Sequence, residues 1–370
     1  MEETIMFVGL DVHKESISVV VAEDGRSGEI HYHGRIANSG AALDGLIKRL
    51  SGPGRRLRFS YEGGPCGYGV YRHLVSRGQD CIVAAPSKLA RKPGDRVKTD
   101  RRDAEGLARQ DRAGELVAVW VPDGSHEAMR DLVRARSTAV ADLRRSRQRL
   151  SSFLLRHDRI YGGRAWTKTH RRWLAAQSFE HAAQQIVLEE MIQVVEDSQE
   201  RCERLTGQIE ELVPSWSMAP VIAALQAMRG IALVTAVTVI AELGDLRRFS
   251  SPRQLMGYLG LTSSEDSSGQ RRRQGAITKA GNSAARKAVI EAAWSYRHRA
   301  RIGASLQARR AQQAKPVRDI AWRAQIRLSA RFRHLRRKGK LPQVAVTAVS
   351  REMLGFIWAI GQEVTPRTTS

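Results

Sequence analysis

The sequence predicts a mixed α/β domain at the N-terminus, followed by a mainly helical remainder. Up to about residue 125, short apolar runs alternate with polar turns and short amphipathic segments, as in a sheet covered by helices. From about residue 126 onward, apolar residues recur at spacings of three and four, which is the helical period. We expect four parts, at residues 1–125, 126–215, 216–310 and 311–370.

The first part opens with strands. Residues 5–23, IMFVGLDVHKESISVVVAE, predict two strands joined by a tight polar turn, and residues 28–38 predict a third. The predicted elements that follow are a helix at 39–52, a strand at 55–64, a helix at 67–78 and a strand at 79–87. The ribonuclease H-like fold has this order of elements, and so does the actin-like ATPase fold.

The middle part predicts long helices. One apolar series alternates spacings of three and four and is broken only by a serine: Leu188, Met191, Val195, Ser198, Cys202, Leu205, Ile209 and Leu212. Together with a weaker series at 128–157, it indicates an antiparallel coiled-coil hairpin or a dimer contact. An ordinary buried helix pair explains the pattern equally well.

The third part contains a segment typical of a helix-hairpin-helix element, which binds nucleic-acid backbones without reading sequence. Residues 225–261 predict a helix, a tight turn at RGIAL, a second helix and a further helix. Backbone amides at the start of the helix after Gly230 are suited to hold a DNA phosphate.

Composition indicates a nucleic-acid partner. The chain has 370 residues and a formal net charge of +23, and most of its 61 basic residues are arginines, which suit bidentate phosphate contacts. Its three cysteines form no CxxC pair, which argues against a disulfide framework or a zinc site. The N-terminus does not resemble a signal peptide, and the apolar stretch 230–243 is too short to span a bilayer. We therefore expect a cytoplasmic protein without a membrane segment.

The last part is strongly basic. Residues 321–340 carry eight lysines and arginines and no acid, with Trp322 and Phe332 interleaved. Such a pattern suits stacking on exposed bases. A basic amphipathic helix packed on the core gives the same pattern.

Four carboxylates stand where an α/β sheet gathers its ligands. Asp11 follows the apolar run FVGL, Glu62 ends the strand RFSYE, and Asp100 and Asp103 would share a helix face. Four oxygen donors suit Mg²⁺ or Mn²⁺. The alternative is that Asp11 starts a turn and that Asp100 is a helix N-cap, with Asp103 reaching back to it.

These residues lie in stretches whose sequence resembles that of the DEDD transposases of bacterial insertion sequences. This family, the insertion sequence 110 family, is related to the Piv DNA invertase. The matching stretches include VGLDVHKESISVVV, SYEGGPCGYGVYRHL, VAAPSKLARKPGDRVKTDRRDAEGLAR and MRGIALVTAVTVIAELGDLRRF, and the resemblance spans roughly residues 5–300. It implies a RuvC-like, ribonuclease H-type catalytic domain whose metal ligands are Asp11, Glu62, Asp100 and Asp103. It also implies a coiled-coil middle and a C-terminal transposase domain.

The resemblance further implies a catalytic serine, a structured noncoding guide RNA that pairs with donor and target DNA, and homodimers or homotetramers. The serine falls in EDSSGQRRRQGAITKAGN, where Ser268 is the first choice, Ser267 the second, and Ser263 and Ser264 follow. Taken alone, DSSGQ reads as a polar turn. The residues expected to hold phosphates are Lys98, Arg101, Arg102, Arg271, Arg272, Arg273 and Lys279.

Three other functions compete with a transposase. A RuvC-type, metal-dependent junction nuclease would share the acids but would not need the serine. An actin-like ATPase or sugar kinase would need further glycine-rich phosphate loops, and none is found in the sequence. A catalytically silent nucleic-acid-binding protein would need neither the acids nor the serine.

Overall fold

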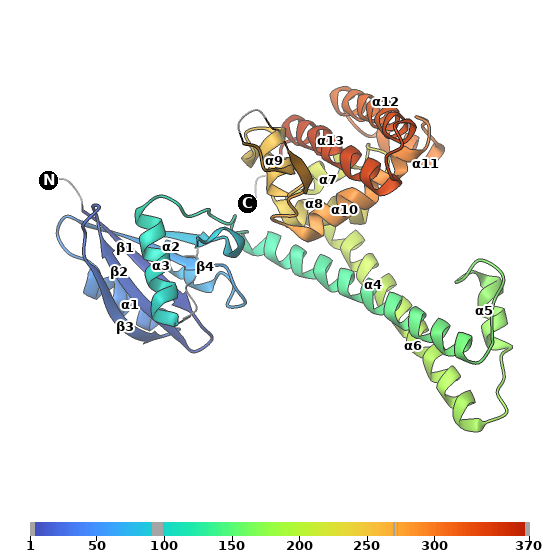
Figure 1. The fold of residues 1–370 in the computed structure, drawn as a ribbon, viewed down its shortest axis with the longest axis horizontal. Helices are drawn as coiled ribbons and strands as arrows, with labels where there is room; N and C mark the ends of the chain where they lie inside the picture. Colours follow the sequence, from blue (N-terminus) through green and yellow to red (C-terminus); the bar gives the residue numbers. More distant parts are fainter. Residues whose placement is uncertain (1–3, 91–98, 269–270, 272, 367–370) are drawn as a thin grey trace. The chain divides into compact units, whose positions relative to one another are not determined.

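The structure is a computed structural model that describes residues 4–90, 99–268, 271 and 273–366. The chain divides into two compact units, Met1–Val121 and Pro122–Ser370 (Figure 1). The finer division of the second unit at residues 216 and 311 stays a prediction.

Unit 1 is a five-stranded mixed sheet with helices, as the sequence predicts. Its strands are β1 (Thr4–Val12), β2 (Ser16–Glu23), β3 (Ile30–Ala37), β4 (Arg55–Glu62) and β5 (Asp80–Ala84). Its helices are α1 (Gly40–Leu50), α2 (Gly69–Ser76), the 3₁₀ turn η1 (Pro86–Lys88) and α3 (Asp100–Arg112). The strand order is β3-β2-β1-β4-β5, with β1, β2 and β3 antiparallel and β4 and β5 parallel to β1.

The two faces of the sheet carry different helices. Leu43 and Leu46 of α1 and Leu74 of α2 pack in one apolar cluster with the strands. On the opposite face, α3 packs against Phe7 and Val20, because alternate residues of a strand point to opposite sides.

Gly9 explains how closely α3 approaches the sheet. A Cβ atom at this position would lie 2.1 Å from the carbonyl oxygen of Ala104. Only glycine leaves room for backbone at that distance. The glycine of FVGL therefore holds the first turns of α3 against the end of β1.

Unit 2 begins with a long helix pair. Its first helices are α4 (Gly124–Arg156), α5 (Lys168–Ala175) and α6 (Ala182–Leu212). Helices α4 and α6 lie side by side, with α5 at their far end (Figure 1). Four residues of α6 at steps of seven are buried: Leu188, Val195, Cys202 and Ile209. The pairing confirms the predicted apolar seam, whereas a supercoiled coiled coil stays a prediction.

The rest of unit 2 is a helical body with one hairpin. Its elements are η2 (Val213–Ser215), α7 (Ala219–Leu225), α8 (Leu233–Leu243), η3 (Leu246–Arg248), α9 (Pro252–Tyr258), β6 (Ser263–Glu265), β7 (Gln274–Ile277), α10 (Ser283–Ala293), η4 (Trp294–Arg297), α11 (Ala304–Ala311), α12 (Lys315–Arg337) and α13 (Pro342–Glu363). The turn at Gly230, α8 and α9 lie where the prediction for 225–261 places them, but the first helix lies earlier than predicted, because α7 ends at Leu225. The hairpin of β6 and β7 was not predicted.

The basic C-terminal helices belong to this helical body. Phe332 of α12 is only 8% exposed and lies in the main core of the unit. The prediction that Phe332 stacks on bases is therefore wrong, and the packed amphipathic helix is the correct interpretation. Helix α13 is long and apolar enough to cross a membrane, but half of its apolar window is buried in the unit, which assigns it to the core.

A buried carboxylate ties three helices of unit 2 together. Glu242, at the end of α8, is 1% exposed. It accepts hydrogen bonds from Arg134 of α4 at 2.7 and 2.9 Å and from Asn282, the N-cap of α10, at 2.6 Å. Burial opposes its ionisation, but the hydrogen bonds from Arg134 and Asn282 and the charges of Arg134 and Arg130 hold the pKa of Glu242 below its ordinary value.

Replacing Glu242 should strongly destabilise unit 2. Glu242→Ala removes the buried acceptor of Arg134 and Asn282 and a negative charge beside Arg130, and breaking a buried pair typically costs about 3–5 kcal/mol. Because the pKa of Glu242 is lowered, its contribution is complete above the ordinary value of 4.5 and is lost as the pH falls through the folded-state value. Urea unfolding should show the full difference from wild type at pH 7, and a difference that shrinks only below about pH 4.5. An equal effect of Glu352→Ala, whose partly exposed carboxylate pairs with the exposed side chains of Arg327 and Arg331, would contradict this account.

Candidate active site

The candidate site begins at the carboxyl end of β1. Asp11 pairs with Ser18 of β2, and Ser18 pairs with Arg35 of β3, so the three residues form one row across the sheet. Asp11 lies two residues after Gly9 and shares the face on which α3 packs. Its side chain is 17% exposed.

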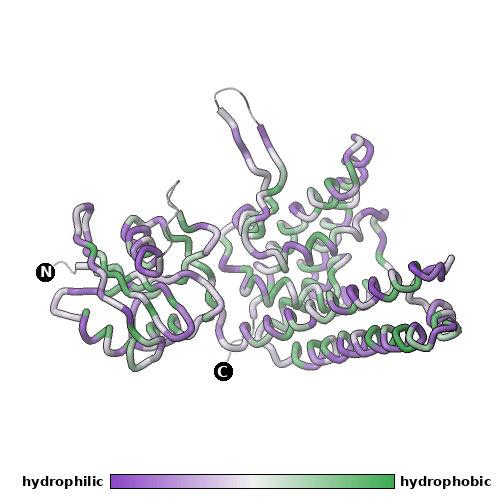
Figure 2. The backbone as a smooth tube through the Cα atoms, turned by 60° about the horizontal axis from the view of Figure 1, so that its bottom comes forward, coloured by the Kyte–Doolittle hydropathy of each residue, from purple (hydrophilic) through white to green (hydrophobic). Residues whose placement is uncertain are grey.

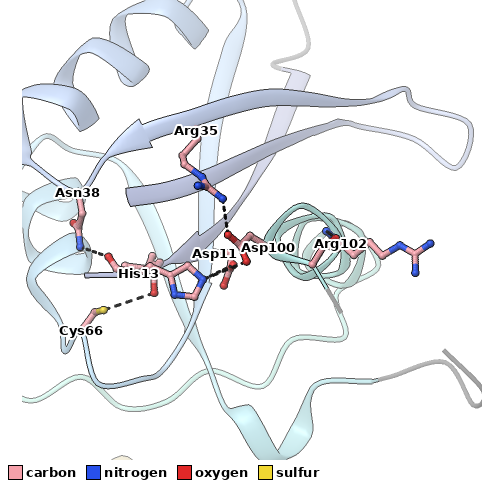
Figure 3. Close-up of polar contacts among 9 residues, drawn as sticks. Asp11, His13, Arg35, Asn38, Cys66, Asp100 and Arg102 are labelled. Atoms are coloured by element: carbon pink, nitrogen blue, oxygen red, sulfur yellow. Dashed lines mark hydrogen bonds and ion pairs between the residues drawn. The ribbon is translucent and has the colours of Figure 1, made fainter. Parts of the chain in front are cut away.

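The first turn of α3 brings a second carboxylate to Asp11. Asp100 is the first residue of the helix, and the cap is Thr99, whose hydroxyl accepts a hydrogen bond from the backbone N–H of Arg102. The alternative in which Asp100 is the N-cap is therefore wrong. Its carboxylate instead turns toward β1 and β3 (Figure 3). Acids in a first helical turn are also favoured by the helix dipole.

Two residues that the sequence analysis missed join these carboxylates. His13 Nε2 lies 3.0 Å from Asp11 Oδ2 and 3.6 Å from Asp100 Oδ1, and Arg35 donates to Asp100 Oδ2 at 2.8 Å (Figure 3). Asp11, His13 and Asp100 offer ligand atoms that all lie within 4.8 Å of one another. The available signal for His13 was its place two residues after Asp11, directly after the end of β1 at Val12, where ligands of a sheet gather.

Glu62 and Asp103 lie near this group without belonging to it, in the part of the chain that the structure describes. Leu10 pairs with Tyr61 on the parallel neighbour strand, so Asp11 and Glu62 are the next residues of adjacent strands and share one face. Asp103 is half-buried in the first turn of α3. The structure thus collects all four predicted acids on one face of unit 1, and the group of three ligand residues that it forms there includes Asp11 and Asp100 but neither Glu62 nor Asp103.

The electrostatics of the group favour a cation. Burial raises the pKa of Asp11, His13 lowers it, and the charges of Asp100 and Asp103 raise it again. Carboxylates of like charge at this separation disfavour joint ionisation unless a positive charge lies between them. A hard divalent cation binds carboxylate oxygens and stabilises the ionised form.

The side chains of Arg101 and Arg102, the two residues of α3 predicted to hold phosphates, point in different directions. Arg101 lies over the ring of Tyr32 on β3, 5.1 Å from its centroid. The side chain of Arg102 points away from the carboxylates (Figure 3). Lys98 lies outside the described residues.

The serine motif lies on the hairpin of β6 and β7, which stands out from the helices of its unit (Figure 2). Ser264 donates to the carbonyl oxygen of Ala276, and Ser267 donates to Glu265 at 3.1 Å and accepts from the N–H of Arg273. Ser268 is exposed, and its described hydrogen bonds join its backbone to that of Arg271. Among the described residues, its hydroxyl has no partner.

Basic residues flank this serine on the same hairpin. Arg271 and Arg273 are exposed on its returning side, and Arg272 lies outside the described residues. Lys279, at the base of the hairpin, is exposed and has a φ of 56°, a left-handed conformation that is uncommon for lysine. Its N–H donates to the carbonyl oxygen of Gly260, so the fold fixes its backbone.

Comparison with known proteins agrees with these features. One family profile, described as a transposase of the DEDD type of IS110, matches residues 8–157, and a second, the transposase IS116/IS110/IS902 family, matches residues 222–308. "Putative transposase y4qE" of Sinorhizobium fredii is 51% identical over 98% of this chain and 90% of its own length. The transposase for insertion sequence element IS1533 of Leptospira borgpetersenii is 31% identical over 90% of this chain and 98% of its own length.

The sheet with its carboxylates and the matching profiles define a transposase, an enzyme that cuts and rejoins DNA. More narrowly, the chain belongs to the IS110 family of insertion-sequence transposases.

Proposed function

We propose that this chain is the RNA-guided recombinase of a bacterial insertion sequence, with a RuvC-like acidic site in unit 1 and a serine nucleophile in unit 2. The observation that carries the proposal is the approach of Asp100 to Asp11, with Asp103 close enough to influence the pKa of Asp11. The strand order β3-β2-β1-β4-β5 supports the ribonuclease H-like assignment.

Mg²⁺ or Mn²⁺ fits the donor set of Asp11, Glu62, Asp100 and Asp103. The oxygen donors are those that both ions prefer, and His13 adds a nitrogen that Mn²⁺ accepts more readily than Mg²⁺ does. When bound, such an ion supplies charge stabilisation for phosphoryl transfer. The chain's own residues orient the site: Arg35 donates to the Asp100 carboxylate, and Gly9 lets α3 approach the sheet closely.

Ser268 is proposed as the nucleophile. Its Oγ attacks the phosphorus of a DNA phosphodiester, so that an Oγ–P bond forms and a P–O bond to one sugar oxygen breaks. The serine hydroxyl gives up its proton and the leaving sugar oxygen takes one up. Attack by a sugar hydroxyl of the new partner strand reverses the step and releases the serine, which requires no energy source besides the phosphodiester itself.

The partners follow from charge and family. A net charge of +23 suits long nucleic-acid backbones, and we propose donor DNA, target DNA and a structured noncoding guide RNA. If base pairing reads the target, no side chain needs to encode its sequence. We further propose homodimers or homotetramers that act at the nucleoid in the bacterial cytoplasm.

The guide RNA can be tested without knowing the target. Sequencing of RNA copurified with the full chain, expressed together with the DNA that flanks its gene, should yield one dominant structured species from those flanks. Catalysis-deficient Asp11→Asn should retain the same RNA, because the acids are assigned to DNA cleavage. A random sample of cellular RNA in both preparations would contradict RNA guidance.

The alternative is a RuvC-type junction nuclease, which would use the same acids and hydrolyse DNA without rejoining it. An exposed hairpin serine such as Ser268, whose hydroxyl has no partner among the described residues, is a feature that the nuclease does not need, whereas the recombinase does.

A further inference from the structure

A cavity in unit 2 is lined by arginines and by no described acid. Its volume is about 380 Å³, and its wall is formed by the turn at Arg229 and Gly230 and by the segment around α11 that contains Arg301, Ser305 and Arg309. None of the three arginines forms an ion pair with any described residue. Arg229 and Arg309 are half-buried and Arg301 is exposed, so the three guanidinium groups place positive charge at a hollow that solvent and an anion can reach.

The fold holds two of these guanidinium groups in place. Arg309 donates through Nη1 to the carbonyl oxygen of Ile231 at 2.7 Å, and Arg229 donates through Nη1 to that of Arg299 at 2.7 Å. Arg309 also donates through Nε to the carbonyl oxygen of Ser305 at 3.4 Å. Neutral carbonyl partners position a guanidinium without neutralising its charge. Arg301 is exposed, and its side chain has no partner among the described residues.

The turn is built for close packing. Gly230 has a φ of 85°, and a Cβ atom there would lie 2.3 Å from the carbonyl oxygen of Ala292 at the end of α10. Glycine is therefore required, and the turn that carries Arg229 is fixed against α10. The hydrogen bond from Arg309 to Ile231 joins the α11 wall of the cavity to this turn.

We propose that this cavity, the arginine pocket of Arg229, Arg301 and Arg309, binds a phosphate group of a nucleic-acid backbone. The proposal rests on the proposed function. Guanidinium groups match phosphate oxygens in charge and in geometry. A phosphodiester group, which carries one negative charge, would supply the counter-charge to these arginines. The segment after Gly303 begins α11 without a side-chain cap, which adds unpaired backbone N–H groups at the same wall.

The location of the pocket relative to the serine hairpin suggests what a phosphate contact there would do. The pocket lies at the C-terminal end of α10, where Gly230 meets Ala292, whereas the serine hairpin leads into its N-terminal end. The eleven residues of α10 rise by roughly 16 Å. A strand that reaches the base of the hairpin can therefore be held a few nucleotides away, so the pocket would fix the position of the strand relative to Ser268.

The test measures the salt dependence of binding by the full chain. Arg301→Gln and the double variant Arg229→Gln/Arg301→Gln are titrated against a labelled DNA duplex and, separately, a labelled RNA hairpin of unrelated sequence. Loss of one phosphate contact should lower the slope of log K against log salt by about 0.9 on duplex DNA. Arg253→Gln is the matched control, because Arg253 is an exposed arginine of α9 outside the pocket, without a described partner. Circular dichroism and thermal melting show that each variant is folded.

A reduced slope for the pocket variants, with the slope of Arg253→Gln unchanged, supports the pocket. A reduction on DNA alone identifies the strand as donor or target DNA, and a reduction on RNA alone identifies it as the guide. Unchanged slopes for both folded pocket variants, or an equal reduction for Arg253→Gln, would overturn the proposal. Strand transfer measured on the same preparations distinguishes failure of the pocket proposal from failure of the proposed recombinase function. Unchanged slopes with normal strand transfer would reject the pocket but not the recombinase function.

Discussion

Ser268→Ala should abolish both strand transfer and any covalent protein–DNA species, with a loss of roughly 10⁶-fold, the size of effect that removal of a nucleophilic serine has in a hydrolase. The expectation follows from the hairpin, where the hydroxyl of Ser268 is exposed and has no described partner. Because the described residues give this hydroxyl no structural contact, we expect Ser268→Ala to stay folded. Denaturing gel electrophoresis of labelled DNA after incubation with the full chain detects the covalent species directly.

Ser267→Ala is the matched control. Ser267 sits next in the sequence, but its hydroxyl bridges Glu265 and the N–H of Arg273 across the hairpin, which is a structural use. We expect Ser267→Ala to weaken the hairpin and lower the rate while the covalent species still forms. A covalent species lost in Ser267→Ala and kept in Ser268→Ala would assign the nucleophile to Ser267. Full hydrolytic cleavage by Ser268→Ala would instead favour the junction nuclease.

The regular elements could be predicted because their sequence carries clear local patterns. Continuous apolar runs between polar turns predicted the first strands of unit 1, and spacings of three and four predicted the seam of α6. The burial of Phe332 was readable too, since it follows Leu328 by four residues on the core face of α12. The basic residues around Phe332 occupy the other faces of the helix and do not interrupt that periodicity.

The hairpin of β6 and β7 could not be predicted in the same way. Its strands, SSE and QGAI, are short, polar and mostly exposed. They therefore have no apolar face from which a strand could be predicted. Cross-strand hydrogen bonds, such as that from Ser264 to Ala276, define the hairpin instead. Sequence periodicity does not record contacts of this kind.

The sequence predicted the carboxylates of the candidate site, but not the residues His13 and Arg35 that contact them. The carboxylates could be found because strand ends and a helix start gather ligands. Arg35 could not, because its place beside Asp100 depends on the register that aligns β3, β2 and β1. The role of Thr99 as the cap of α3 was also open in the sequence, since both Thr99 and Asp100 are residue types that cap helices.

Asp11→Asn should remove catalysis and, at the same time, change how the protein responds to a divalent cation. The asparagine has the same shape and can still accept a hydrogen bond from His13, so the fold should persist. Loss of one ionic ligand should reduce strand transfer by about a thousandfold, corresponding to several kcal/mol of lost transition-state stabilisation. The measurement is strand transfer at saturating Mg²⁺, together with thermal unfolding in the presence and absence of Mn²⁺.

The unfolding data give the sharper criterion. In the wild type, Mn²⁺ at 100 times its Kd should raise the free energy of unfolding by about 2.7 kcal/mol. The metal-free Asp11→Asn protein should be at least as stable as the metal-free wild type, because burial and the charges of Asp100 and Asp103 already disfavour the ionised form of Asp11. It should then gain little from Mn²⁺. Asp80→Asn, at the edge strand β5 and paired with Arg56, is the control that should keep the full response to Mn²⁺. Normal stabilisation by Mn²⁺ in Asp11→Asn would contradict a metal site at Asp11, since a ligand that binds only the folded state must stabilise it in proportion to its affinity.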